Sequence, residues 1–134
     1  MNINLTRDEL RLLLDLAYAG NWVLNSTRGD DRLAPYDGLV SKLFGEALRV
    51  NMPELIEIQD AGVVPSQAYR DGGIHEAIMD YEDSMFFEIL AEELARRDMN
   101  HVPISGENFH ELSGRIEEYI EEFEQNGMDN LTIN

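Results

Sequence analysis

Between Gly106 and Gly127, apolar side chains recur every three or four residues, which is the period of an amphipathic α-helix. At 100° per residue they fall within an arc of about 100°. The stripe consists of Phe109, Leu112, Ile116, Tyr119, Ile120 and Phe123. We expect a helix that buries this stripe, begins after Ser105 as its N-cap and ends at Gly127.

Glutamates occupy the other side of the same helix, over a separate arc of about 160°. They are Glu107, Glu111, Glu117, Glu118, Glu121, Glu122 and Glu124. Like charges four residues apart, as in Glu117 and Glu121, oppose the helix by about 0.2–0.5 kcal/mol per pair. Residues 116–134 contain no Lys or Arg that would relieve this repulsion. Two interpretations follow: a solvated face built from a good helix former, or a docking surface for a basic partner.

The net charge of −17 is concentrated in the second half of the chain. Residues 1–67 contain ten acidic and six basic residues, whereas residues 68–134 contain seventeen acidic and four basic residues. Because 43% of the 134 residues are hydrophobic, the charge belongs to a folded domain and not to a disordered acidic tail. A surface of this sign disfavours direct binding to nucleic acids and to membranes, and it favours basic partners and cations.

Thr6 and Glu9 have the spacing of a capping box, which predicts that the first helix begins after Thr6. From Leu10 to Leu24 apolar residues cover two faces, so we expect a helix that is buried on several sides. Either it is the central helix of a bundle, or one of its faces forms a homodimer interface.

Further helices are predicted along the rest of the chain. One runs from about Tyr36 to Val50, and a short one follows Pro53. The segment 74–98 is helical in content, but one continuous helix would place glutamates among its apolar residues. We therefore expect two helices that meet near Asp80 or Asp83, the second with Phe86, Ile89, Leu90 and Leu94 in the core. Residues 1–134 should form an all-α, single-domain bundle of about four or five helices.

The two ends of the chain resemble each other, as "NINLT" at residues 2–6 and "NLTIN" at residues 130–134. Both alternate apolar and polar residues, which is typical of strands. One arrangement is a short two-stranded ribbon that joins the termini; in the other, Ile3 and Leu5 serve as the lead-in and staple of the first helix.

The sequence offers little catalytic chemistry. It contains no cysteine, which excludes disulfides and thiolate metal sites. We find no nucleophile elbow, phosphate-binding loop or dinucleotide fingerprint, and we expect no catalytic residues and no cofactor. The start lacks the features of a signal peptide, and no run of about 18 apolar residues occurs, so we expect a soluble cytoplasmic protein.

Metal binding through carboxylates is the alternative. Glu107 and His110 form half of the paired Glu-x-x-His motif of di-iron bundles, and an acidic cluster could supply oxygen ligands for Mg²⁺ or Ca²⁺. The weak candidates for a metal site are Asp80, Glu82, Asp83, Glu107 and His110. Our main hypothesis is a non-enzymatic acidic module that binds a basic protein partner through the glutamates of the last helix. The alternative is a helical bundle that binds a divalent metal or small ligand, with hydrolysis as the activity that such a site could support.

Overall fold

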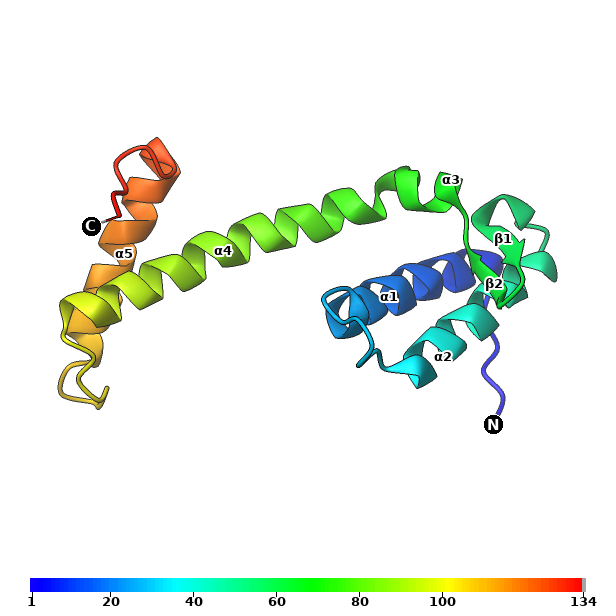
Figure 1. Ribbon diagram of the computed structural model, residues 1–134, viewed down its shortest axis with the longest axis horizontal. Helices are drawn as coiled ribbons and strands as arrows, with labels where there is room; N and C mark the ends of the chain where they lie inside the picture. Colours follow the sequence, from blue (N-terminus) through cyan, green and yellow to red (C-terminus); the bar gives the residue numbers. More distant parts are fainter. Residues whose placement is uncertain (134) are drawn as a thin grey trace. The chain divides into compact units, whose positions relative to one another are not determined.

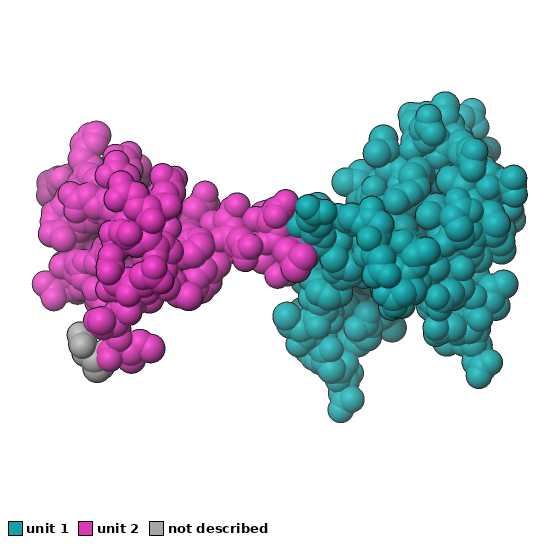
Figure 2. Space-filling model, turned by 90° about the horizontal axis from the view of Figure 1, so that it is seen from above, with its two compact units in different colours: residues 1–78 teal, residues 79–134 magenta. Residues whose placement is uncertain are grey.

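The computed structural model describes residues 1–133, which divide into two compact units, unit 1 with residues 1–78 and unit 2 with the described residues from 79 onwards (Figure 2). Over residues 1–133 the chain is predominantly helical, with four helices of at least twelve residues and one small antiparallel sheet. The predicted fold class is confirmed. That residues 1–134 act as one domain stays a prediction.

Unit 1 combines two helices with a β-hairpin (Figure 1). Its two strands pair antiparallel, with Ile56 opposite Pro65 and Gln59 opposite Gly62. Gly62 has a φ of 126°, a conformation that favours glycine, and this permits the tight connection between the strands. The elements are α1 (Arg7–Asn25), α2 (Ala34–Gly45), 3₁₀ turns at Glu46–Leu48 and Pro53–Leu55, β1 (Ile56–Gln59), β2 (Gly62–Pro65), α3 (Gln67–Tyr69) and a π-helical turn at Arg70–Ile74.

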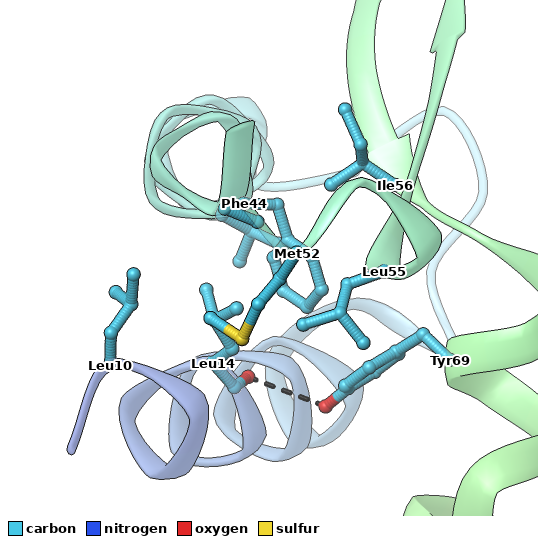
Figure 3. Packing of buried hydrophobic residues seen from close by; sticks show 9 residues of the cluster. Leu10, Leu14, Phe44, Met52, Leu55, Ile56 and Tyr69 are labelled. Carbon is cyan, nitrogen blue, oxygen red and sulfur yellow. Dashed lines mark hydrogen bonds between the residues drawn. The ribbon is translucent and has the colours of Figure 1, made fainter. Parts of the chain in front are cut away.

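The core of unit 1 is centred on Tyr69, which is 1% exposed. Its ring meets that of Phe44 edge to face at a centroid distance of 4.9 Å, and its hydroxyl donates to the Leu14 carbonyl at 3.5 Å (Figure 3). The same hydroxyl donates to Asp15 Oδ1 at 2.7 Å. Burial and the hydrogen bond to Asp15 raise the pKa of Tyr69, so it remains a neutral donor at physiological pH. This residue ties α1 and α2 to the segment that leads into α4 (His75–Asp98).

Unit 2 contains most of α4 and all of α5 (Phe109–Asn126) (Figure 1). Near the connection between the helices, Ala95, Met99 and Leu112 are buried together. Further along, the rings of Phe87 and Phe123 lie 5.4 Å apart. The helix α5 therefore folds back against α4, and its predicted apolar stripe faces that helix except at Phe109, which is 56% exposed.

Three local predictions are confirmed. Thr6 Oγ1 accepts from the backbone N–H of Glu9 at 3.1 Å, and Glu9 Oε1 accepts from that of Thr6 at 3.0 Å, which completes the capping box. Gly127 follows the last helix with a φ of 56°. A single 3₁₀ turn, Pro53–Leu55, forms the short helix predicted after Pro53.

The predicted break in the segment 74–98 is wrong, because α4 is one continuous helix from His75 to Asp98. Apolar residues lie on all sides of α4, so the helix has no single apolar face. Phe86 and Ile89, which we expected in the core, are 46% and 56% exposed, whereas Ala91 and Ala95 are fully buried. The chain bends earlier, at the π-helical turn, where Gly73 has a φ of 114°.

The predicted starting point of the last helix is also wrong. The helix α5 begins at Phe109, with Asn108 in the N-cap position. Residues 105–108 form a turn instead, since Asn108 Oδ1 accepts from the backbone N–H of Ser105 at 2.8 Å. The Ser105 hydroxyl accepts from the backbone N–H of Glu107, at 3.3 Å.

The terminal ribbon is absent from the described residues. Neither residues 2–6 nor residues 130–133 form a strand, and residue 134 lies outside the described residues. The two-stranded ribbon of this chain is internal, at residues 56–65. Leu5 and Ile3 lead into α1, the other arrangement that the sequence allowed.

The first helix is less buried than expected. Its core face contributes Leu10 and Leu14, but Leu12, Leu16 and Val23 are 63%, 72% and 74% exposed. Since the second apolar face has no covering, α1 is buried on one main side and not on several.

Candidate functional site

The structure places the predicted glutamates on and just before α5. Glu107 lies in the turn that precedes the helix, and the other six follow along it. All are exposed except Glu122, which is half-buried. Leu112 and Phe123 on the opposite side are buried, so the two faces of the helix are separated as predicted.

Most of these glutamates are not neutralised. Arg115 pairs with Glu111 at 3.1 Å, and Glu122 accepts from Asn126 at 3.0 Å and from Asn130 at 2.7 Å. In residues 1–133, Glu117, Glu118, Glu121 and Glu124 have no ion-pair partner. Their negative charge is therefore available to an incoming cation.

A groove of about 680 Å³ lies between α4 and α5, within unit 2. Its apolar part is formed by Phe87 from α4 and by Ile116, Ile120 and Phe123 from α5. Tyr119 extends the aromatic packing, with its ring 6.2 Å from that of Phe123. This is a surface where an apolar side chain could leave water.

Carboxylates border the groove on both sides. Glu88 and Glu92 line it from α4, and Glu124 lines it from α5. At 100° per residue, Glu117 and Glu121 lie on the same flank of α5 as Glu124. The apolar surface is therefore enclosed by acidic residues on two helices that are far apart in sequence.

The arginines of unit 2 do not cancel this charge. Residues 79–134 contain fifteen acidic residues and only three arginines, which gives a net charge of −12. Arg96 pairs with Glu92 at 2.8 Å and Arg97 with Asp98 at 3.0 Å, while Arg115 pairs with Glu111. Each arginine forms an ion pair with one neighbouring carboxylate, and a large excess of negative charge remains.

A hydrogen-bonded cluster joins the end of α4 to α5. The Tyr119 hydroxyl donates to Asp98, and the Arg97 guanidinium lies 3.4 Å from the same hydroxyl. The hydrogen bond from Tyr119 and then the Arg97 guanidinium hold the pKa of Asp98 below its usual range, and that bond raises the pKa of Tyr119. This cluster helps to fix the spacing of the two helices, so the groove does not have to be created by a ligand.

The structure does not assemble the metal-site candidates. Asp80, Glu82 and Asp83 lie along one straight helix, and its 100° step points Glu82 away from the other two. Glu107 and His110 lie at the start of α5, next to the opposite end of α4. In residues 1–133, no three His, Asp or Glu side chains are grouped as metal ligands.

The contribution of α4 to the groove was missed from the sequence. We had assigned its core to Phe86, Ile89, Leu90 and Leu94. The contact with α5 instead uses Phe87, Ala95 and Met99, and Ala91, which completes their four-residue spacing, is buried as well. The two alanines in this series mark the buried side of α4, and they would have placed Glu88 and Glu92 beside the contact.

A second cavity, of about 600 Å³, lies within unit 1 among α1, α2 and the hairpin. Its one carboxylate is Asp37, which accepts two hydrogen bonds from Arg32, at 2.6 and 2.8 Å, and one from Asn21, at 2.9 Å. The bonds from Arg32 hold the pKa of Asp37 below its usual range. Asp37 therefore holds the loop between α1 and α2 in place through these hydrogen bonds. Because it is already paired, it is a poor candidate for acid–base chemistry.

Comparison with known proteins gives no further guidance on function. No protein family matches this chain, and neither a curated protein nor a solved structure is detectably similar to it. Among the helices of residues 1–133, none combines the length and the apolar character that crossing a membrane requires.

Proposed function

We propose that this protein is a cytoplasmic, non-enzymatic interaction module that binds a basic protein segment through the acidic surface of unit 2. The observation that carries the proposal is the set of four glutamates on α5 without an ion-pair partner in the described chain, of which all but Glu118 lie on the flank of the helix beside an apolar groove. They are Glu117, Glu118, Glu121 and Glu124.

Binding of a cationic segment would be favourable for two reasons. Each Lys or Arg of the partner gains Coulomb energy from the nearby carboxylates, of the order of 1 kcal/mol per close pair in water. The partner also relieves the repulsion between glutamates four residues apart, such as Glu117 and Glu121. Both contributions are screened by salt, so the complex should weaken as ionic strength rises. The same charge disfavours nucleic acids and anionic membranes.

The test is capture of basic proteins and peptides by the purified chain at low and at high salt. We expect partners that are retained at low salt and released at high salt. The double variant Glu118→Lys with Glu121→Lys should lose them, because it reverses two charges of the unpaired set. If no salt-labile partner is found, or if charge reversal leaves capture unchanged, the proposal is wrong.

We also propose that α1 mediates homodimerisation. Leu12, Leu16, Ala19 and Val23 are spaced by four, three and four residues, the pattern of a helix–helix seam, and the small Ala19 allows close approach. The three larger residues are among the most exposed apolar side chains of unit 1. Sedimentation of the wild-type chain and of Leu16→Glu over a range of concentrations tests this: a monomer at every concentration refutes it.

A further inference from the structure

We propose that the groove between α4 and α5 receives one amphipathic helix of the partner, with apolar residues on one face and Lys or Arg on both sides of that face. This inference rests on the function proposed above and specifies the shape of the basic segment. An acidic surface alone would accept any cationic chain. The groove adds a requirement for apolar side chains at fixed spacing.

The composition of the groove supports the apolar part of this proposal. Phe87, Ile116 and Ile120 line it and are only half-buried. Two helices cannot enclose a core by themselves, and a further helix seated in the groove would cover part of the apolar surface that they leave exposed. Burying this surface would stabilise the complex by about 25 cal/mol per Å² of apolar area removed from water.

The dimensions of the groove fit a short helix. Its lining runs from Ser84 to Glu92 on α4 and from Ile116 to Glu124 on α5, which is nine residues on each helix. At 1.5 Å per residue this is about 12 Å, or slightly more than two helical turns. An occupying helix of this length places three apolar residues in contact, at positions i, i+3 or i+4, and i+7.

The distribution of charge specifies the flanks of the occupant. Glu88 and Glu92, the second of which pairs with Arg96, border one side of the groove, and Glu124 borders the other, with Glu117 and Glu121 on the same flank of α5. Because both borders are acidic, the helix that fits should carry basic residues on both sides of its apolar stripe. A helix with one basic and one acidic flank would face repulsion along one border. This complementarity of charge identifies a basic amphipathic helix and argues against a neutral or an acidic one.

Two synthetic peptides of identical composition and charge test the proposal on the full chain. In the first, leucines lie at helical spacing between lysines and arginines; in the second, the same residues are scrambled so that no apolar face forms. We expect the first to bind at least about tenfold more tightly, since the groove buries its leucines. We expect Ile120→Ser to weaken the first peptide by about tenfold and to leave the second unchanged. Ile89→Ser, on the exposed side of α4, is the matched control and should have no effect on either peptide.

Chemical-shift mapping on the wild-type chain supplies a readout that does not depend on a variant. Saturating amounts of the first peptide should perturb residues 84–92 and 116–124 together. Equal affinity for the two peptides, or perturbations confined to other residues, would overturn the groove inference while the proposed binding of basic partners stands. If neither peptide binds even at low salt, the proposed function itself fails.

Discussion

Removing the unpaired charge beside the groove should weaken the binding of a basic amphipathic peptide by about tenfold. The variant carries Glu117→Gln, Glu121→Gln and Glu124→Gln, which keep the shape and helix propensity of the side chains. None of the three has an ion-pair partner in residues 1–133, so no arginine is released by the change. An exposed ion pair contributes about 0.2–1 kcal/mol, and three at about 0.5 kcal/mol give about 1.5 kcal/mol, close to a factor of ten in Kd.

The measurement is a titration of labelled peptide followed by fluorescence anisotropy at low and at high salt. The factor of ten applies at about 0.01 M salt and should vanish near 1 M, where charges are screened beyond about 3 Å. A matched control variant carries Glu54→Gln, Asp60→Asn and Glu76→Gln, which are exposed residues of unit 1. It changes the net charge by the same amount.

The comparison of the two triple variants separates a local site from a general effect of charge. If both lose affinity equally, the peptide responds to the net charge of −17 and not to the groove. Folding is checked by thermal unfolding. The site variant should be at least as stable as the wild type, because it removes the repulsion between Glu117 and Glu121.

Further outcomes can be checked by measurements of stability and association. Asn25→Asp should lower the free energy of unfolding by about 2–4 kcal/mol in urea titrations, because the buried amide donates two hydrogen bonds, at 2.7 and 3.2 Å, that a carboxylate cannot donate. The pKa of Asp98 is lower in the folded chain than in the unfolded one. The Asp98 carboxylate therefore stabilises the folded chain at pH values above its unfolded pKa, and this stabilisation is lost as the pH falls towards its folded pKa. Asp98→Asn should remove this part of the acid dependence of the unfolding free energy. In thermal-shift assays, Mg²⁺ and Ca²⁺ should stabilise the chain no more than other salts at matched ionic strength, and a saturable shift at micromolar metal would contradict this. Leu16→Glu should abolish the concentration-dependent dimer that we propose for α1.

Local signals in the sequence predicted two helix ends correctly. The capping box of Thr6 and Glu9 and the glycine at position 127 require nothing beyond their own helix, and both are found in the structure. The last helix was predicted from its two separated faces. The hairpin at residues 56–65 was not predicted from the sequence. Pro53 favours the start of a helix, whereas the alternation of Ile56 and Ile58 with polar residues is typical of a strand, and the structure follows the second signal.

The groove could not be predicted from the sequence, because it depends on which side of α4 packs against α5. Apolar residues surround α4, so several sides satisfy the same hydrophobic pattern. The side that is used carries the buried Ala91 and Ala95, and Phe87 and Glu88 lie beside the groove. The predicted metal site depended on the same unknown geometry, since its acidic residues come from both helices.

Salt provides an independent way to separate the two surfaces that we propose. Binding of a basic helix to unit 2 joins opposite charges, so added salt should weaken it. Association of two chains through α1 brings together molecules that each carry a net charge of −17, so added salt should strengthen it by screening their repulsion. The apolar seam itself is little affected by moderate salt, and unit 1, at −5, contributes less of the repulsion than unit 2, at −12. A single salt series that follows peptide affinity and self-association on the same sample should therefore show opposite slopes. Two slopes of the same sign would mean that at least one of the two surfaces has been assigned the wrong partner.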